Sequence, residues 1–269
     1  MKILITGGNG FVGRNIIKFL GKDYDLYAPT RSQLDLTDEK SVKEYLQNKF
    51  FDVVIHCAIK GGRRTTPDTS STLQDNLKMF FNLMNNKNRF DRLINFSSGA
   101  DFDKTKNVNI NNHNLENSYP IQPYDMSKNI ISRIIKSCSR CYNFRIYGVF
   151  GEDEAQDRFI ASNIKRYKNQ VPIEIHQNRY WDFFDIKDLV NVVKYYIDNP
   201  KLDLDNEMDL IYQNLLSLKN VAELINNLDK HSVEIKVDNH SRDLDYLGNK
   251  SYGVNLSIEK GLEEIYNAL

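Results

Sequence analysis

The chain has 269 residues and a formal net charge of zero, because 36 lysine and arginine residues are matched by 36 aspartate and glutamate residues. Without a net positive field, neither nucleic acid nor an anionic membrane surface is an expected partner. The length suits one domain of roughly 100 to 200 residues with about half a domain left over.

The start of the chain and its cysteines favour a cytoplasmic protein. Met1 is followed at once by the strand-like run 2–5, which lacks the basic start and longer apolar stretch of a signal peptide. No apolar run approaches the roughly 20 residues that cross a bilayer, so no membrane association is expected. Three cysteines are too few for a disulfide framework, and Cys138 and Cys141 lack the further ligands of a metal site, so no metal is expected.

Short apolar runs alternate with helical periods through the first half of the chain. Strands are expected at 2–6, 24–28, 52–57, 93–96 and 143–149, and helices from residue 10, then at 39–49, 73–85 and 124–137. This alternation is typical of a parallel sheet covered by helices on both faces, a doubly wound α/β fold. Residues 1–150 are expected to form this domain.

The regular alternation ends near Gly151. Helices are expected at 158–168, at 186–198 and from Ser217, with a short strand at 173–176. Residues 151–269 are expected to form a smaller mixed α/β portion on the substrate side, with a strand at 209–212 that returns to the main sheet. The asparagine-rich segment 104–117 is expected to be a polar loop.

A glycine-rich turn, TGGNGFVG at 6–13, joins the first strand to the first helix. Glycines spaced in this way permit a tight turn, let the backbone approach a pyrophosphate and allow close packing of helix on strand, while the helix N-terminus offers free N–H groups to the anion. A turn that binds nothing is the alternative, but the strand before it and the helix after it favour a dinucleotide-binding Rossmann domain. The residues expected around the cofactor are Gly7, Asn9, Gly10, Phe11, Val12 and Gly13.

The end of the second strand bears on which dinucleotide is bound. NAD-binding domains of this fold usually carry an acid there, whereas an arginine accommodates the 2′-phosphate of NADP. The segment 27–32 has no acid but has Arg31 followed by Ser32. This favours NADP(H) as the cofactor; an ordinary solvated arginine is the alternative.

Tyr124 and Lys128 stand four residues apart, which places them on one face of the expected helix. A phenol with an ordinary pKa near 10 is a poor acid or base at neutral pH, and a nearby cation lowers that pKa by stabilising the phenolate. Ser98 follows the strand at 93–96, so its hydroxyl is expected at the carboxyl edge of the sheet, where ligands of this architecture bind. The three residues are candidates for proton transfer during hydride transfer; an exposed tyrosine beside a lysine is the alternative.

The order and spacing of these features resemble the extended short-chain dehydrogenase/reductase family of nucleotide-sugar epimerases, dehydratases and reductases. The resemblance runs through Thr6-Gly7, His56-Cys57-Ala58, Phe96-Ser97-Ser98, Tyr124 with Lys128, Arg145 with Gly148 and Gly151, and Asp182-Phe183 with Asp188-Leu189. It implies that Tyr124 is the acid–base group, that Lys128 lowers its pKa and binds the ribose, and that Ser98 contacts the carbonyl oxygen. It further implies a supporting role for Asn76, cofactor contacts from Cys57 and Ala58, and a homodimer formed through helices such as that of Tyr124.

Departures from the family pattern narrow the reaction. Dehydratases carry an acidic pair where this chain has Gly99 and Ala100, and epimerases that retain NAD usually show the ribose-binding acid that is absent here. The stretch 30–38 resembles the GDP-fucose synthase and dTDP-4-dehydrorhamnose reductase branches, which implies that Asp35 and Leu36 border the adenine. Arg158 replaces a histidine that assists epimerisation in the first branch, which favours reduction of a 4-keto sugar without epimerisation. A 4-epimerase with bound NAD and a non-catalytic NADPH sensor stay open as alternatives.

A nucleotide-sugar substrate needs cations for its diphosphate. Lys165, Arg166 and Arg179 lie in the expected region, while Trp181 replaces an arginine of the family pattern and is expected to stack on a base or cover the sugar. The alternatives are a solvated helix face for the first two cations and a core position for the tryptophan. The residues expected to bind the substrate are Ser98, Gly99, Arg158, Lys165, Arg166, Arg179 and Trp181.

Overall fold

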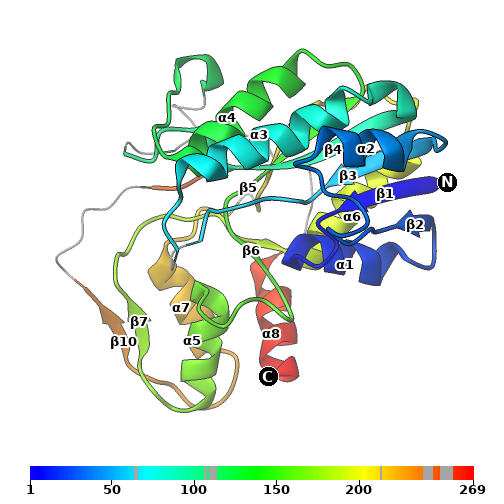
Figure 1. The fold of residues 1–269 in the computed structure, drawn as a ribbon. Helices are drawn as coiled ribbons and strands as arrows, with labels where there is room; N and C mark the ends of the chain where they lie inside the picture. Colours follow the sequence, from blue (N-terminus) through cyan, green and yellow to red (C-terminus); the bar gives the residue numbers. More distant parts are fainter. Residues whose placement is uncertain (64–65, 106–107, 109–113, 213, 239–244, 249–256) are drawn as a thin grey trace. The chain divides into compact units, whose positions relative to one another are not determined.

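The structure, a computed structural model, describes residues 1–63, 66–105, 108, 114–212, 214–238, 245–248 and 257–269 (Figure 1). The chain forms two compact units, each built from separate segments. Unit 1 comprises Met1–Asp103, Asn114–Arg145 and Val190–Met208, and unit 2 comprises Lys104–His113, Ile146–Leu189 and Asp209–Leu269.

A six-stranded sheet forms the centre of unit 1, and it confirms the expected doubly wound parallel fold. The strands are β1 (Lys2–Thr6), β2 (Asp25–Tyr27), β3 (Phe51–His56), β4 (Phe90–Ser98), β5 (Cys141–Ile146) and β9 (Glu207–Leu210). Their order is β2-β1-β3-β4-β5-β9, and the pairings of β1 with β2, β1 with β3 and β3 with β4 are parallel. The chain order switches direction between β1 and β3, and in open α/β sheets ligands bind beyond the carboxyl ends of the strands at such a point.

Helices cover both faces of this sheet. The helices are α1 (Phe11–Leu20), α2 (Glu39–Leu46), α3 (Ser70–Met84), α4 (Pro123–Lys136) and α6 (Ile186–Asp198), with short 3-10 helices at Lys87–Arg89, Gly99–Asp101 and Leu115–Asn117. Figure 1 shows α2, α3 and α4 on one face of the sheet and α1 on the other. Since both faces are covered, the central strands are apolar along their length, and Ile3, Leu4, Ile5, Val53, Val54 and Ile55 are fully buried.

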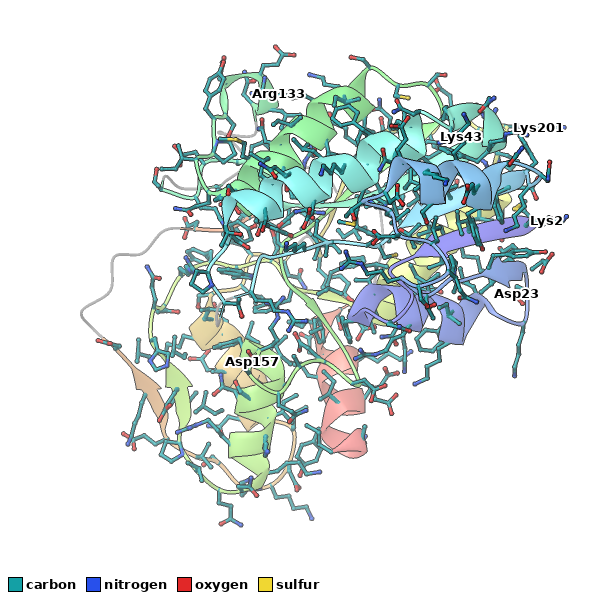
Figure 2. All side chains as sticks on the ribbon, viewed as in Figure 1. Lys2, Asp23, Lys43, Arg133, Asp157 and Lys201 are labelled. Carbon is teal, nitrogen blue, oxygen red and sulfur yellow. The ribbon has the colours of Figure 1, made fainter. Side chains whose placement is uncertain are left out.

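The main core of unit 1 lies between the sheet and helices α2, α3 and α4. Val42 and Leu46 of α2, Phe80 of α3 and Ile131 of α4 pack there, and all are at most 2% exposed. Full burial of one such side chain stabilises the fold by about 1.5–3 kcal/mol. Charged side chains such as Lys43 project outward from the same helices (Figure 2).

The described residues of unit 2 include two short parallel strand pairs and three complete helices, together with the start of α6. The strands are β6 (Val149–Phe150) with β8 (Phe184–Asp185) and β7 (Ile173–Ile175) with β10 (Ile235–Val237), and the helices are α5 (Phe159–Lys168), α7 (Leu218–Asn226) and α8 (Ile258–Ala268). Ser217 caps α7 as expected, because its hydroxyl accepts the N–H of Asn220 at 3.1 Å. In the part of the chain that the structure describes, no helix is both long and apolar enough to cross a membrane.

The segment 104–117 is not entirely the loop that was expected. Leu115–Asn117 forms a 3-10 helix whose first N–H groups are accepted by the side chain of Asn114, and Val108 forms a parallel bridge with Tyr246. Residues 106–107 and 109–113 of the expected loop lie outside the described residues.

Candidate active site

The glycine-rich turn after β1 has the conformation that its sequence predicts. Gly7 has a φ of +68°, and a Cβ there would lie 2.6 Å from the backbone nitrogen of Ala58. A Cβ on Gly13 would lie 2.4 Å from the carbonyl oxygen of Gly7. Gly10 is the N-cap of α1, and glycine has no side chain that could cover the N–H groups of Phe11 and the residues after it. The residues present therefore fit the pyrophosphate of a dinucleotide, because they leave both room and N–H donors at this turn.

The ends of β1 and β3 are joined beside this turn. The Thr6 hydroxyl lies 2.8 Å from His56 Nδ1 and 3.4 Å from the N–H of Ala58. Burial lowers the pKa of His56 to about 3, and the nearby Lys128 ammonium acts in the same direction, so the imidazole is neutral. Burial also raises the pKa of Cys57, which keeps the thiol protonated. His56 is a satisfied core residue, and the backbone at Cys57 and Ala58 forms the floor of the turn.

Arg31 lies in the loop after β2, with its side chain 79% exposed. Its Nε lies 3.3 Å from Asp35 Oδ2, a contact that an exposed arginine can exchange for another anion at small cost. Hydrogen bonds from the hydroxyl and N–H of Thr37 hold the pKa of Asp35 below its usual range. Leu36 is buried in the core of unit 1, so of the two residues expected at the adenine only Asp35 has an accessible side chain.

The candidate proton-transfer residues are all in unit 1, at the carboxyl edge of its sheet. Lys128 is only 6% exposed; its Nζ donates to the carbonyl oxygen of Phe96 at 2.6 Å and lies 5.8 Å from the ring centroid of Tyr124. Ser98 ends β4, and its hydroxyl accepts the N–H of Ala100 at 3.2 Å. Burial lowers the pKa of Lys128 to about 8, although Asp101 opposes this shift.

Asn76 connects these residues to the loop after β3. Its side-chain oxygen accepts the N–H of Lys60 at 2.9 Å, and its nitrogen donates to the Lys60 carbonyl and to Ser127 Oγ, each at 3.0 Å. The Ser127 hydroxyl in turn donates to the carbonyl oxygen of Tyr124 at 2.6 Å. Asn76 therefore links the loop after β3 to the start of α4, and Lys60 and Ser127 are partners that the sequence does not reveal.

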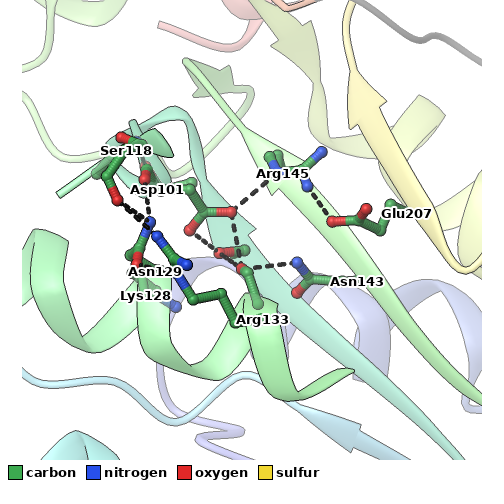
Figure 3. Close-up of polar contacts among 12 residues, drawn as sticks. Asp101, Ser118, Lys128, Asn129, Arg133, Asn143, Arg145 and Glu207 are labelled. Carbon is green, nitrogen blue, oxygen red and sulfur yellow. Dashed lines mark hydrogen bonds and ion pairs between the residues drawn. The ribbon is translucent and has the colours of Figure 1, made fainter. Parts of the chain in front are cut away.

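Asp101 is the centre of a buried polar network next to the site (Figure 3). Its carboxylate is fully buried and accepts hydrogen bonds from Ser97 at 2.5 Å, Ser132 at 2.7 Å and Arg145 at 2.9 Å. Arg145 also pairs with Glu207. Burial raises the pKa of Asp101 and Arg145 opposes that shift. This network fixes the turn that carries Ser98, although Asp101 is not among the residues that the sequence predicts at the site.

The residues expected to bind substrate are in unit 2, apart from Ser98 and Gly99. The Arg179 guanidinium lies 4.3 Å from the ring centroid of Trp181, and this ring lies 4.5 Å from that of Tyr246. Arg166 pairs with Glu174, and its Nε donates to the Pro172 carbonyl oxygen at 2.6 Å, contacts that fasten α5 to β7.

The remaining two cations differ from Arg166. Lys165 is exposed on α5, and Arg158 pairs with the buried Glu154 at 3.5 Å, with its own side chain 45% exposed. The structure therefore brings Arg179 and Trp181 together, while Arg166 has the contacts of a packing residue. Among the described residues, no group of three or more histidines, cysteines or carboxylates is arranged to hold a metal ion.

A model of the family described as "NAD dependent epimerase/dehydratase family" matches residues 3–212. The chain belongs to this epimerase/dehydratase family. Its members include nucleotide-sugar oxidoreductases and epimerases, so the expected resemblance to the extended short-chain dehydrogenase/reductases is confirmed.

Two sequence relatives and one solved structure that are similar to this chain have a GDP-sugar in their names. GDP-L-fucose synthase of Azorhizobium caulinodans is 37% identical over 104 residues, which are 37% of this chain and only 33% of that enzyme. GDP-L-colitose synthase of Yersinia pseudotuberculosis is 25% identical over 224 residues, 74% of this chain and 73% of the relative. The solved GDP-mannoheptose C4 reductase of Campylobacter jejuni, with NADP bound, has a TM-score of 0.80 at 17% identity and covers 99% of this chain and 97% of its own. At that identity the last likeness shows the fold alone.

Proposed function

We propose that this chain is an NADPH-dependent reductase that converts the 4-keto group of a nucleotide-linked sugar to a hydroxyl, without epimerisation, in the supply of surface-glycan precursors. The observation that carries the proposal is the placement of Lys128 Nζ on the Phe96 carbonyl, beside the Tyr124 ring and next to the strand end that carries Ser98. The glycine turn and Arg31 belong to the same unit.

The roles follow from the chemistry of the side chains. A dinucleotide held through its pyrophosphate at the glycine turn would supply, from its reduced nicotinamide, the hydride that adds to the carbonyl carbon. The Tyr124 hydroxyl delivers a proton to the carbonyl oxygen, and the buried Lys128 charge stabilises the phenolate that is left behind. The Ser98 hydroxyl orients the same oxygen by a hydrogen bond.

Two features support reduction with NADPH. Arg31 is exposed after β2, where NAD-binding relatives of this fold place an acid, and a guanidinium pairs well with a phosphate. Neither Gly99 nor Ala100 supplies the carboxylate that a dehydratase would need after Ser98. Arg158, paired with Glu154, is a permanent cation and so a poor proton carrier for epimerisation.

The test measures the oxidation of NADPH, and separately of NADH, by the loss of absorbance of the reduced cofactor. The substrates are freshly generated GDP-, dTDP- and UDP-linked 4-keto sugars. We expect turnover with NADPH and one of these nucleotides, and a kcat about 10²–10⁴-fold lower in Tyr124→Phe with NADPH binding retained. Arg31→Gln should raise the KM for NADPH roughly tenfold and leave that for NADH unchanged. No oxidation of either cofactor, with NAD tightly bound in the purified protein, would instead identify a 4-epimerase. Reversible NADPH binding without turnover would identify a sensor.

A further inference from the structure

A short backbone segment after β3, Lys60-Gly61-Gly62, lies directly against the ring of Tyr124. A Cβ on Gly62 would lie 2.8 Å from both Cε2 and Cζ of that ring and 3.1 Å from Cδ2. Ordinary carbon contacts are about 3.5–4.0 Å. The bare backbone of Gly62 therefore packs against the edge of the ring that carries the phenol oxygen, with no space for a methyl group.

The segment has a defined conformation. Gly61 and Gly62 are both left-handed, with φ of +84° and +71°, which side chains other than glycine rarely adopt. The N–H of Gly62 donates to Asp68 Oδ1 at 3.0 Å. A Cβ on Gly61 would lie 2.1 Å from Asp68 Oδ1 and 2.5 Å from the methyl of Thr72, and no atom of Tyr124 is among its three nearest neighbours.

The segment and the tyrosine are also tied to one side chain. Asn76 bonds both backbone groups of Lys60 and the hydroxyl of Ser127, which donates to the Tyr124 carbonyl. A contact between Lys60 Nζ and Asp75 at 2.6 Å adds a second link to α3. These bonds hold the backbone at 60–62 at a fixed distance from the start of α4. The Tyr124 ring lies against the backbone at 60–62.

We propose that Gly62 is a positioning residue for Tyr124, and that its bare backbone determines where the phenol hydroxyl lies. This inference rests on the proposed role of Tyr124 as proton donor. Proton transfer requires donor and acceptor within hydrogen-bond reach, and a misplacement of about 1 Å costs about 10²-fold in rate. An alanine methyl at position 62 would displace the ring, the segment or both by about that distance.

The test compares Gly62→Ala with Gly61→Ala. Both variants force alanine into a left-handed conformation, but the new methyl is nearest the Tyr124 ring in the first and nearest Asp68 and Thr72 in the second. We expect Gly62→Ala to lower kcat at least tenfold with the KM values and NADPH affinity within about twofold. Gly61→Ala should lower Tm more, because its methyl meets Thr72, yet lower kcat less. In a Tyr124→Phe background, Gly62→Ala should cause no further loss, whereas equal losses in both backgrounds would refute the positioning role.

A conservative pair tests the anchor of the segment. Asp68→Ala removes the acceptor for the Gly62 N–H and should lower kcat, while Asp68→Asn retains an oxygen acceptor and should restore most of it. A loss of the same size in both variants would contradict this part of the inference.

A measurement without turnover separates this inference from the proposed function. In protein labelled with 3-fluorotyrosine, the ¹⁹F resonance of Tyr124 is identified by its absence in Tyr124→Phe. Its shift and titration midpoint should change in Gly62→Ala and change less in Gly61→Ala. If the native protein reduces no 4-keto sugar but this shift occurs, only the proposed function fails; if turnover is present and the resonance does not change, the positioning inference fails.

Discussion

Lys128 is a buried ammonium group, and its environment links catalysis to stability. Its Nζ bonds the Phe96 carbonyl, and burial lowers its pKa from the ordinary lysine value of 10.5 to about 8. Between these two values the unfolded chain keeps a proton that the folded chain has released, so the free energy of unfolding rises with pH through this window. Below about pH 8 the folded protein bears the full cost of burying the charge.

We predict that Lys128→Met separates the contribution of Lys128 to catalysis from its effect on stability. The variant should lose about 10²-fold or more in kcat because nothing stabilises the phenolate. Its stability relative to the native protein should fall by about 3 kcal/mol between pH 8 and about pH 10.5, because over this range only the native protein gains stability as its folded lysine loses the proton. Denaturant unfolding at several pH values measures this difference. Lys78→Met, on the exposed face of α3, is the control. A stability difference for Lys128→Met that does not vary with pH would show that Lys128 keeps its proton.

Single residues differ in how far the sequence reveals them. Tyr124 and Lys128 are predictable because one turn of a helix places them together, whatever the rest of the fold. Asp101 is not, because two of the side chains that donate to its carboxylate, Ser132 and Arg145, lie 31 and 44 residues away. The substrate-binding residues are hard to predict because their partners are likewise set by the fold. Arg166 has the charge expected of a phosphate ligand, but Glu174 and the Pro172 carbonyl bind it.

Among the elements, β4 is longer than its sequence suggests. The expected strand was 93–96, because Asp91 and Arg92 interrupt the apolar run, but the strand spans Phe90–Ser98. Arg92 is only 2% exposed, and its Nη1 donates to the carbonyl oxygens of Tyr196 at 2.7 Å and Ile197 at 3.1 Å. Both carbonyls are in the last turn of α6, where Arg92 is a donor to the helix end. The burial of Arg92 in this strand becomes clear when its hydrogen bonds to the end of α6, about a hundred residues later in the sequence, are known.

We predict that Arg92→Met weakens the docking of α6. The substitution keeps much of the volume but removes the Arg92 hydrogen bonds to two carbonyl oxygens and a charge at the negative end of the helix, so the free energy of unfolding should fall by about 2–4 kcal/mol. Denaturant titration measures this loss, and hydrogen exchange should locate it at the end of α6. Lys201→Met, exposed just beyond α6, should change stability by less than about 0.5 kcal/mol. A similar small change for Arg92→Met would mean that water replaces the guanidinium.

At the scale of the whole molecule, unit 1 is not continuous in sequence. Its third segment, Val190–Met208, includes most of α6 and the first half of β9. Tyr196 lies 5.0 Å and 4.8 Å, between ring centroids, from Tyr142 and Phe144 of β5, and the N–H of Asn143 donates to the Asn206 carbonyl at 2.7 Å. The alternation of strands and helices predicts the fold, but it does not reveal that a helix from the second half completes the first unit, since local periodicity carries no information on which elements pack together.

We therefore predict that a fragment of residues 1–150 does not fold as a domain. Without 190–208 it would expose the β5 side chains that Tyr196 covers, remove the two carbonyl acceptors of Arg92 in α6 and open the outer edge of β5 to other chains. Such a fragment should retain far-ultraviolet circular dichroism, lose the near-ultraviolet signal of packed aromatics, bind a hydrophobic dye and unfold without a cooperative transition. A longer fragment, 1–208, contains all three segments of unit 1 and should recover the near-ultraviolet signal and a cooperative transition. Cooperative unfolding of 1–150 would instead show that the glycine turn, Tyr124 and Lys128 are held by a self-sufficient domain, for which the returning helix is dispensable.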